Sequence, residues 1–546
     1  MKKIILALAL AACPLGLWAD GLERCYLSLD RRVYVAGDNI WCSAFCLDAD
    51  GQLSTESAVC YVEIASSHST AVTAKIALMN GRGAGVIPIP LNVPTGNYRI
   101  TAYTAVERCE SDFSPYAHSG EIAIYNTGSS ARVPGGVKVA EGPLPPAGAG
   151  ESSRPGLLTL ACDGEALTLL STDSASVSVS ICHDDGMPAP AAFDACSFKA
   201  LLPRAAAYSQ EVQPEFDGEV IRAVISGPDA ARVQKDPTAV AIVSSPGSAG
   251  DTYLSDIGSD GRVVFETNNI YGRRDLVCEV TGNQGGYDCT FVPEDKFLRA
   301  KVETSVLFLS PEYAPQLLER SLAMRTERNA DTLYEFMPKR ENLLLNHEDC
   351  LVYHLDDYTR FPTVQDIIIE IIPELRVRRD ASGARELRMV YKDAHSWHAA
   401  FSHNVMALLD GVPVTDLEHL LSFDAMLLSD IQLFPYTYSF GGKVYEGVAN
   451  FITTKGDISS LAFDRGVRIV DFDGTSYPVA YTCEGLSESA SDHRQLLYWH
   501  PAVTLRRGEA SRISFRAPSY GGKFRAVVDG FTFSGVPVHE EISFTL

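Results

Sequence analysis

The residues best suited to chemistry are the histidine and cysteine side chains between positions 347 and 354. His347, Cys350 and His354 are metal ligands by type, because imidazole nitrogen and thiolate sulfur both bind Zn²⁺. A tetrahedral site also needs a fourth ligand, which one of the neighbouring aspartates at 349, 356 and 357 would have to supply. Acidic side chains in a connecting segment are usually solvated. We therefore expect an ordinary polar junction here, and we predict no metal-binding residue.

Two acidic turns could be mistaken for ligand loops. Residues 48–51 (Asp-Ala-Asp-Gly) begin like a calcium loop, but the twelfth position of such a loop is a glutamate and here it is Val59. Residues 183–186 (His-Asp-Asp-Gly) directly follow an apolar run and are typical of a polar turn after a strand. We interpret both segments as turns, and the sequence predicts no cofactor.

No motif of a common catalytic class is present. The sequence contains no phosphate-binding loop, Rossmann glycine fingerprint, serine nucleophile elbow or zinc-protease helix. Trp499 and His500 could belong to a sugar-binding site, but an aromatic residue in such a strand more often closes a sandwich core. We therefore predict that the protein is not an enzyme.

The cysteines are spread over strand-like segments. Cys42 and Cys46 lie four residues apart on one alternating run, and along a strand that separation is ~13 Å, so they cannot bond to each other. Other cysteines also lie in apolar or alternating stretches, at positions 60, 162, 182, 278 and 289. We expect mostly buried free thiols. One or two cross-strand disulfides remain an alternative that the sequence does not assign.

Composition and charge restrict the class of protein. The chain has 546 residues, of which 46% are apolar, with 46 Lys and Arg against 69 Asp and Glu and a net charge of −23. That length and apolar share are typical of several folded domains. The acidic balance argues against binding to nucleic acid or anionic lipid, because phosphate contacts need basic side chains.

The first residues are typical of an export signal. Lys2 and Lys3 precede a short apolar core, and a small-residue cleavage site at Ala19 lies just before Asp20. The alternative is a lipoprotein signal that ends at Cys13, which would then carry the lipid. We expect an exported protein, periplasmic or associated with the outer membrane, with no transmembrane span in the mature chain.

The first 100 residues after the signal have the spacing of an immunoglobulin-like sandwich. Turn signals separate seven alternating segments, which we predict as strands over residues 24–30, 38–48, 57–66, 72–78, 83–89, 96–106 and 119–125. Within them, residues 26–41 (YLSLDRRVYVAGDNIW) resemble the opening of the second macroglobulin-type domain of alpha-2-macroglobulin-like proteins. Residues 96–104 (GNYRITAYT) resemble the late strand of that domain.

The macroglobulin resemblance implies a search for an internal thioester, Cys-Gly-Glu-Gln. The sequence has none, and the nearest string, Cys-Asp-Gly-Glu at 162–165, is more typical of a hairpin turn. Protease trapping through a thioester is therefore not expected. A protease-interacting protein without a thioester stays as an alternative, in which the Gly/Pro/Ser-rich residues 127–156 would be an exposed bait segment.

Residues 357–457 carry a second resemblance. A helix start at Thr363, the sequence MALLDGVPV at 406–414 and the sequence YEGVANFITTK at 445–455 resemble the plug domain of TonB-dependent outer-membrane receptors of the SusC type. A receptor barrel needs about 22 strands, each of roughly 9–11 residues. The 89 residues from 458 to 546 cannot supply them. The order of segments is instead similar to barrel-less envelope proteins that combine macroglobulin-type and plug-like domains, so we predict no transporter.

We predict a mainly β, multidomain protein with tandem immunoglobulin- or macroglobulin-like β-sandwiches, a small α+β plug-like domain and a C-terminal β domain. The expected parts are a signal peptide (1–19), a macroglobulin-like sandwich (20–126), a linker or long loop (127–156), a second sandwich (157–212), a third, transthyretin-like β domain (213–300), a helical connector (301–356), the plug-like domain (357–457) and a C-terminal sandwich (458–546).

These observations predict a non-enzymatic, exported cell-envelope protein that acts as a binding or scaffold module. An enzyme with a site assembled from distant residues remains an alternative, as does the protease-interacting protein. We expect the partner to be another envelope protein, and the oligomeric state stays open. Turns rich in Gly and Pro run over surfaces, so we expect the interaction surface to include Asp410, Gly411, Val412, Pro413, Phe440, Gly441, Gly442 and Lys443.

Overall fold

A computed structural model gives the fold of most of the chain. It describes residues 23–111, 113–114, 116, 119–140, 156–202, 214–247, 251–268, 270–282, 285–329, 333–335, 350–380, 383–391, 400–401, 404–414, 416–440, 443–456, 466–482 and 492–546. The protein is mainly β and contains several separate sheets, as predicted. Contacts divide it into a first unit (residues 1–216, 299–334 and 479–546) and a second unit (residues 217–298 and 335–478).

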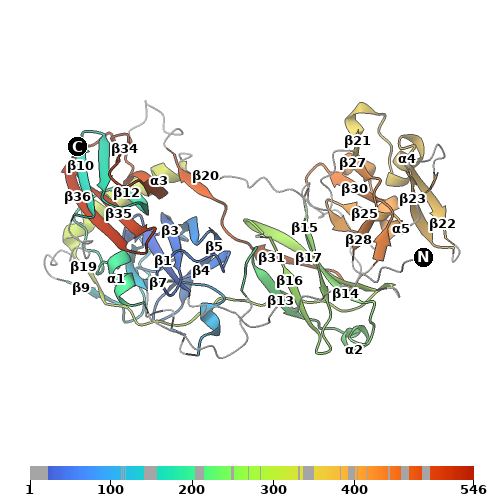
Figure 1. Cartoon of the computed structure of the whole chain (residues 1–546), viewed down its shortest axis with the longest axis horizontal. Helices are drawn as coiled ribbons and strands as arrows, with labels where there is room; N and C mark the ends of the chain where they lie inside the picture. Colours follow the sequence, from blue (N-terminus) through green and yellow to red (C-terminus); the bar gives the residue numbers. More distant parts are fainter. Residues whose placement is uncertain are drawn as a thin grey trace, which may run out of the picture. The chain divides into compact units, whose positions relative to one another are not determined.

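The first unit opens with the predicted N-terminal sandwich, drawn in blue in Figure 1. Its strand order is β1-β3-β6-β5-β4-β7-β8-β2. The strands are β1 (Arg24–Leu29), β2 (Val33–Val35), β3 (Asn39–Leu47), β4 (Val59–Ala65), β5 (Thr70–Met79), β6 (Arg82–Pro88), β7 (Gly96–Tyr103) and β8 (Gly120–Tyr125). The seven predicted strands are present. The prediction missed β2, a three-residue strand that pairs in parallel with β8.

The apolar positions of these strands meet in one core, which includes Ile40, Val62, Ile76 and Ile122. Strand alternation places such residues on one face, so the sandwich follows directly from the period-2 pattern. Asn80 and Gly81 join β5 to β6 with positive φ values of 53° and 72°, as a two-residue hairpin turn requires.

A second sandwich in the first unit combines strands from both ends of the chain. One sheet has the order β10-β11-β34 and the other β33-β12-β35-β36. The bounds are β10 (Leu158–Asp163), β11 (Ala166–Ser171), β12 (Ala175–His183), β33 (Leu496–Leu505), β34 (Ala510–Ser514), β35 (Lys523–Thr532) and β36 (Pro537–Thr545). Figure 1 shows the teal strands β10 and β12 beside the red strands β34, β35 and β36.

This pairing corrects the prediction of two sandwiches at 157–212 and 458–546. β12 has C-terminal strands on both of its edges, β33 on one and β35 on the other. Its apolar residues Val177, Val179 and Ile181 are fully buried against Phe524 and Val528. Strands β10, β11 and β12 alone could not cover these apolar side chains of β12. The segment after β12 contributes only the short helix α1 (Ala195–Ala200) among its described residues.

The predicted connecting segments also contain structure. Helix α3 (Ala314–Asn329) follows the one-turn helix η3 (Pro311–Tyr313), and the hydroxyl of Ser310 caps the start of η3. One face of α3 packs on the N-terminal sandwich through Met324, whereas Leu318 and Leu322 are exposed. The predicted linker at 127–156 contains β9 (Val137–Val139), which pairs in parallel with β19 (Leu307–Leu309). Residues 141–155 of it lie outside the described residues.

The second unit begins with the predicted third β domain. Its main sheet has the order β15-β14-β17-β18, and β13 pairs with β16. The bounds are β13 (Val220–Val224), α2 (Ala230–Val233), β14 (Val240–Ser245), β15 (Asp251–Asp256), β16 (Arg262–Glu266), β17 (Arg273–Gly282) and β18 (Gly285–Gly286). β17 also pairs with β31 (Arg468–Asp473), in addition to its pairing with β14. The predicted C-terminal domain therefore gives one strand to this sheet, which is a second correction to the domain boundaries.

The rest of the second unit is an α+β part over the predicted plug-like segment. Its main sheet has the order β21-β27-β30-β25-β26, and a smaller sheet has the order β22-β23-β24. The bounds are β21 (Leu351–His354), α4 (Val364–Glu370), β22 (Leu375–Arg379), β23 (Arg385–Tyr391), β24 (Ala400–Phe401), β25 (Met406–Leu409), β26 (Val412–Pro413), α5 (Leu417–Leu421), β27 (Leu428–Phe434), β28 (Tyr438–Phe440), β29 (Lys443–Tyr445) and β30 (Val448–Thr453).

Helix α4 starts where the sequence predicts. The Thr363 hydroxyl accepts a hydrogen bond from the amide of Asp366 (3.2 Å), and the helix ends before Pro373. Its residues Ile367 and Ile368 enter the core between the two sheets. Short elements complete the chain: η1 (Glu107–Cys109), β20 (Leu333–Glu335), η4 (Leu355–Asp357), η5 (Ala425–Leu427) and β32 (Val479–Tyr481).

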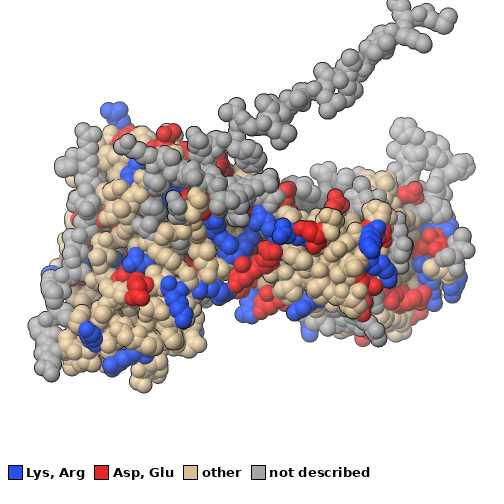
Figure 2. All heavy atoms as spheres, turned by 90° about the horizontal axis from the view of Figure 1, so that it is seen from below, with Lys and Arg blue, Asp and Glu red and all other residues tan. Residues whose placement is uncertain are grey.

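The surface charges are mixed, and the cysteines are mostly buried free thiols, as predicted. On the face shown in Figure 2, acidic and basic side chains are interspersed over the described surface. Every described cysteine is a free thiol, and most of them are buried. In the described part of the chain, none of the helices has the length and apolar character needed to span a membrane.

Candidate functional site at the junction of the two sandwiches

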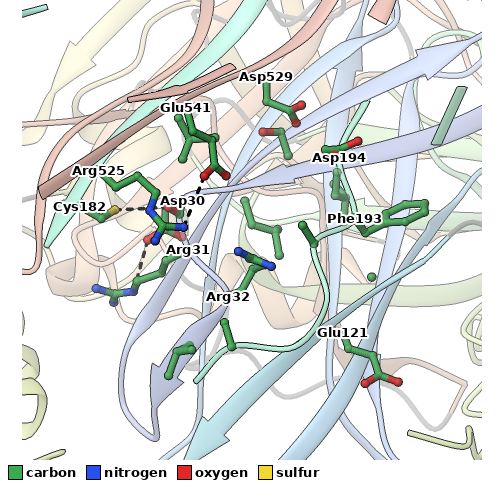
Figure 3. Close-up of a pocket in the computed structure, with 18 of the residues that line it drawn as sticks. Asp30, Arg31, Arg32, Glu121, Cys182, Phe193, Asp194, Arg525, Asp529 and Glu541 are labelled. Carbon is green, nitrogen blue, oxygen red and sulfur yellow. Dashed lines mark hydrogen bonds and ion pairs between the residues drawn. The ribbon is translucent and has the colours of Figure 1, made fainter. Parts of the chain in front are cut away.

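A pocket of about 340 Å³ opens in the first unit, where both sandwiches meet (Figure 3). Its walls are β1, the turn 30–33, the segment 182–194, and strands β35 and β36. Pockets that hold small molecules have about this size, and most have apolar walls with a few well-placed polar groups. Here the polar groups are mainly charged. We call this cavity the junction pocket.

Arg32 is the charge in this pocket with the fewest partners. Its Nη1 donates one hydrogen bond, to the carbonyl oxygen of Pro190 (2.8 Å). Among the described residues it makes no ion pair with a carboxylate, and Figure 3 shows no contact between it and the other residues drawn. Burial lowers the pKa of the Arg32 guanidinium, although the negative charges of Glu541 and Asp194 oppose this shift. Its remaining N–H groups are therefore available to an acceptor in the pocket.

The acidic side chains of the pocket, in contrast, are already paired. Asp529 accepts hydrogen bonds from the Tyr26 hydroxyl and from Nδ1 of His539 (3.0 Å). Nε2 of His539 lies 3.5 Å from Glu541, and Arg525 lies 3.4 Å from the same carboxylate. Burial works against a charged imidazole, but hydrogen bonds to Asp529 and Glu541 raise the pKa of His539 to about 10. His539 is therefore an imidazolium at neutral pH, held between two carboxylates.

A second charged cluster lies beside the pocket around Arg31. Its guanidinium is 3.5 Å from Asp30 and 3.2 Å from Asp38, and it stacks over the ring of Tyr34 at 5.1 Å. Burial raises the pKa of Asp30 to about 6, against the attraction of Arg31. Burial likewise raises the pKa of Glu327, on α3, to about 7. For both carboxyl groups, burial therefore raises the pKa more than the positive charge of Arg31 lowers it.

Cys182 is a thiol in the wall of the junction pocket. Its Sγ donates to the carbonyl oxygen of Asp30 (3.3 Å), which Figure 3 shows as a dashed line. Burial raises the pKa of the Cys182 thiol well above its usual value. A protonated thiol is a poor nucleophile, so this cysteine is not prepared for covalent catalysis.

The acids of the predicted polar turn at 183–186 bind arginines. Asp184 accepts from Arg525 (2.9 Å), and Asp185 accepts two bonds from Arg320 (2.6 and 2.9 Å). Burial opposes ionisation of Asp185, but these bonds and the charge of Arg320 hold its pKa below the usual value. The turn therefore fixes the pocket wall to α3 and β35.

The predicted interaction turn at 410–413 is buried, which contradicts its expected exposure. The Asp410 carboxylate accepts from the amide of Thr453 (2.8 Å) and from its hydroxyl (2.7 Å). The amide of Gly411 donates to the side chain of Asn450 (3.0 Å). Asp410 and Gly411 have φ values of 48° and 79°, so the turn is tight, and β30 holds its inner side.

Strand β15 covers the other side of this turn. The hydroxyl of Thr252 donates to the carbonyl oxygen of Gly411 (3.1 Å). Val412 is buried, and only Pro413 is partly exposed. A turn rich in Gly and Pro was expected on the surface, but the sheets that contain β15 and β30 enclose it. Asp410, Gly411 and Val412 are thus structural residues.

The second predicted segment, 440–443, is only partly described. Phe440 and Lys443 lie opposite each other at the ends of β28 and β29. Gly441 and Gly442 lie outside the described residues. The role of this segment as an interaction surface therefore stays a prediction.

The other candidates from the sequence are placed as follows. Nδ1 of His354 lies 2.6 Å from Asp430, Cys350 bonds a neighbouring carbonyl, and His347 is outside the described residues. Over the described ranges no three metal-ligating side chains gather in one place. Trp499 is buried against Trp41, with ring centres 5.1 Å apart. It is a packing residue, but its apolar cluster joins residues of both sandwiches and is separate from the core of the second sandwich, where it was expected.

Sequence reasoning missed the junction pocket. Arg31 and Arg32 lie in a segment that carries the macroglobulin resemblance. Arginines are common on protein surfaces, however, so the residue type alone did not indicate a binding site. Besides its chain neighbours, the residues that line the pocket around Arg32 come from distant segments, including residues 100–121, 182–194 and 525–541. No local pattern links such segments, so only the pairing of β12 with the C-terminal strands could have revealed the pocket.

The chain was compared with known proteins. It matches no protein-family model and no curated protein. Among solved structures it is similar to native *Escherichia coli* alpha-2-macroglobulin, with 9% identity, 96% of this chain and 22% of that chain covered, and a TM-score of 0.16. It is also similar to E. coli alpha-2-macroglobulin activated by porcine elastase, with 8% identity, 96% of this chain and 43% of that chain covered, and a TM-score of 0.24.

A similarity to the *Yersinia pseudotuberculosis* adhesin InvE has 11% identity, covers 50% of this chain and 58% of that chain, and has a TM-score of 0.14. The chain spans less than half the length of the alpha-2-macroglobulin structures. Similarities of this size establish neither a shared fold nor a shared activity. The architecture rests on the strand pairing described above.

Proposed function

We propose that the protein is a non-enzymatic binding module of the bacterial cell envelope, and that the junction pocket is its ligand site. The observation that carries this proposal is Arg32, whose guanidinium lies in the pocket with one carbonyl partner. Two nearby acids, Asp529 and Glu541, are paired with His539 and Arg525. An incoming anion would therefore meet the free donors of Arg32.

The walls favour a small organic carboxylate. A carboxylate matches the planar fork of a guanidinium with two parallel hydrogen bonds. Ala189, Ala192 and Phe193 give the pocket an apolar side that would hold the body of such a ligand. The cavity of about 340 Å³ limits that body to a small molecule or to the end of a peptide.

The pocket residues favour binding over catalysis. The thiol of Cys182 is kept protonated by burial, and the imidazole of His539 is kept charged by two carboxylates. A thiol of that kind does not attack, and an imidazolium that stays charged up to pH ~10 does not act as a base near neutral pH. We therefore place the protein with binding or scaffold proteins, not with enzymes.

We further infer that residues 357–457 are a plug-like docking domain that binds another envelope protein. The order of elements supports this inference, since a capped helix, a hairpin, the β25–β26 turn and the closing strand β30 follow the sequence of the resemblance. Deleting residues 357–457 and comparing the envelope proteins that co-purify tests it. An unchanged set of partners would contradict it.

The alternative is a protease-interacting protein that exposes residues 127–156 as bait. Val137–Val139 within this segment is paired with β19, and paired backbone is a poor protease substrate. Incubation with elastase or trypsin distinguishes the two functions. A bait protein would be cut first between 127 and 156 and would reduce the protease activity.

Binding at Arg32 can be measured directly. Octanoate, phenylacetate and a capped dipeptide with a free carboxyl end are suitable probes, with their amides as controls. We expect one of the carboxylates to bind in calorimetry, its amide not to bind, and Arg32→Met to weaken binding at least tenfold. Arg506→Met, at an exposed site on the second sandwich, is the matched control. Equal binding to wild type and Arg32→Met would overturn the proposal.

A further inference from the structure

A second candidate surface lies in the second unit, between helix α4 and strand β22. It is a groove of about 610 Å³. We call it the arginine groove, and its lining is Gln365, Ile368, Ile369, Leu375, Arg376, Val377, Arg378, Arg379 and Arg385. It is remote in sequence from the turn at 410–413, which is buried.

Three arginines of this groove have no carboxylate partner among the described residues. Arg376 donates to the carbonyl oxygens of Ile372 (3.1 Å) and Leu375 (3.0 Å). Arg378 donates to that of Val377 (3.1 Å), and Arg379 to that of Gly383 (2.7 Å).

The next two arginines of the hairpin differ, because each is paired with a glutamate. Arg385 lies 3.1 Å from Glu418, and Arg388 lies 2.5 Å from Glu386. Three uncompensated positive charges within four residues are unusual in a chain whose net charge is −23. They mark a local surface that is complementary to acid.

The same strand has a free edge. β22 is the end strand of the sheet β22-β23-β24, and among the described residues no strand pairs with its other side. The amide of Val390 donates to the carbonyl of Glu374 (2.8 Å), and that of Asp380 donates to the carbonyl of Ala384 (2.8 Å). Since main-chain groups alternate in direction along an antiparallel strand, even-numbered residues of β22 face β23. The main-chain groups of Leu375, Val377 and Arg379 therefore point away from β23. The amide of Leu375 already donates to the carbonyl of Ile372 (3.3 Å), so the donors that this edge offers are the amides of Val377 and Arg379.

The groove also offers an apolar contact. Ile369, on the outer side of α4, is 60% exposed. Val377 is half-buried and lines the same groove, and the residue before Ile369, Ile368, is buried in the core. A strand added along β22 would present alternate side chains to these residues and to solvent.

We propose that the β22 edge binds an extended acidic segment of a partner protein as an added strand. Main-chain hydrogen bonds would form at residues 377 and 379. The partner's carboxylates would replace the local carbonyl contacts of Arg376, Arg378 and Arg379 with charge-assisted hydrogen bonds. The proposal names the chemistry of the partner inferred for residues 357–457. It does not depend on the junction pocket.

A simpler role for these arginines is protection of the edge against aggregation, since charged side chains commonly block exposed strand edges. Protection alone predicts that no acidic strand binds. A third role, attraction to an anionic membrane, predicts binding to lipid without any need for main-chain pairing. The three roles therefore differ in measurable ways.

The test uses the full chain and a fluorescein-labelled, capped peptide with the sequence Val-Glu-Val-Glu-Val-Glu-Val. We expect saturable binding in fluorescence anisotropy that weakens with salt. The double variant Arg378→Glu/Arg379→Glu should raise the dissociation constant at least tenfold. The matched control is Arg506→Glu/Arg507→Glu, two exposed arginines on the second sandwich, which should leave it unchanged. Absence of peptide binding to the wild type would overturn the proposal.

Two further measurements separate strand addition from charge alone. A peptide of the same charge with alternate amides N-methylated cannot complete the ladder, so it should lose at least tenfold in affinity. Equal affinity for both peptides would overturn strand addition. Vesicles with 30% phosphatidylglycerol are the lipid probe, and vesicle binding that depends on Arg378 and Arg379 while the peptide does not bind would assign the surface to a membrane. If the peptide fails but deletion of 357–457 still removes a partner, the docking domain stands and only this edge is excluded.

Discussion

At the scale of single residues, the charges around the junction pocket are set by a competition between burial and pairing. Asp30 and Glu327 share one arginine, Arg31, and burial raises the pKa of Asp30 from 3.8 to about 6 and that of Glu327 from 4.5 to about 7. His539 is equally buried, but two carboxylates raise its pKa from 6.5 to about 10. All three groups therefore bind a proton more tightly in the folded protein than in the unfolded chain.

These shifts predict how stability changes with pH. A raised pKa contributes stability that is complete below the unfolded value and is lost as pH rises through the folded value. For Asp30 the window runs from pH 3.8 to about 6, and its contribution is on the order of 3 kcal/mol. We expect urea unfolding to give a higher free energy of unfolding at pH 5 than at pH 8. Asp30→Asn should reduce that difference. An identical pH dependence in both proteins would contradict the pKa of Asp30.

His539 allows a direct measurement. Its imidazole should remain protonated at pH 8, and NMR of selectively ¹³C-labelled histidine reports this state. Asp529→Asn removes the largest favourable charge, so the pKa of His539 should fall by at least one unit. His500, whose pKa burial lowers, is an internal reference that should already be neutral at pH 8. A neutral His539 at that pH would show that the pair with Asp529 is not formed in solution.

At the scale of elements, helix α3 is fixed to the first unit by one arginine. Arg320 is buried, and it donates to both oxygens of Asp185 and to the carbonyl of Val33 (2.7 Å). Removing one partner of a buried ion pair leaves the other charge without compensation. The apolar contacts of Met324 support the same face of the helix. The wall of the junction pocket and the position of α3 therefore depend on the same bond.

Replacing this arginine should be costly. We expect Arg320→Ala to lower the free energy of unfolding by about 3–5 kcal/mol. Arg325→Ala, on the exposed side of the same helix, should change it by less than about 0.5 kcal/mol. Thermal unfolding followed by circular dichroism compares the two variants. Similar losses in both would mean that helix propensity, and not the ion pair, determines the effect.

The elements also show what the sequence could and could not predict. The N-terminal strands and the start of α4 were predicted correctly because alternation and capping are local patterns. The partners of β12 could not be predicted, because the two strands that pair with residues 175–183, β33 and β35, lie more than 300 positions away in the sequence. Asp410 and Gly411 have the composition of a surface turn, but contacts with Thr252, Asn450 and Thr453, which are distant in sequence, bury them. Arg32 was missed for the same reason, because its surroundings are assembled from distant segments.

At the scale of the whole molecule, the chain leaves the first unit and returns to it. Residues 217–298 and 335–478 form the second unit, while 299–334 and 479–546 belong to the first. The second sandwich is therefore complete only when the C-terminal strands are present. Strands β33 and β35 pair with the two edges of β12. One sandwich is therefore built from two segments that lie far apart in the sequence.

Truncation tests this organisation. A chain that ends at residue 478 loses both neighbours of β12 and exposes Val177, Val179 and Ile181, each worth about 1.5–3 kcal/mol of burial. We expect limited proteolysis to cut it between residues 157 and 183. A chain that ends at residue 536 keeps β33 and β35 and should be much more resistant there. Resistance of the shorter chain would contradict the shared sandwich.

The bond between Tyr26 and Asp529 joins β1, near the start of the described chain, to β35, near its end. A stretching force applied between Glu23 and Leu546 would thus act entirely within the first unit, because both attachment points belong to it. The second unit, although it includes more than 200 residues between these points, would bear no tension until the two sandwiches separate. In a single-molecule pulling experiment the first rupture would then be the opening of the first unit, and only afterwards would the second unit lengthen. The protein could be anchored at one end and pulled at the other without distorting the arginine groove.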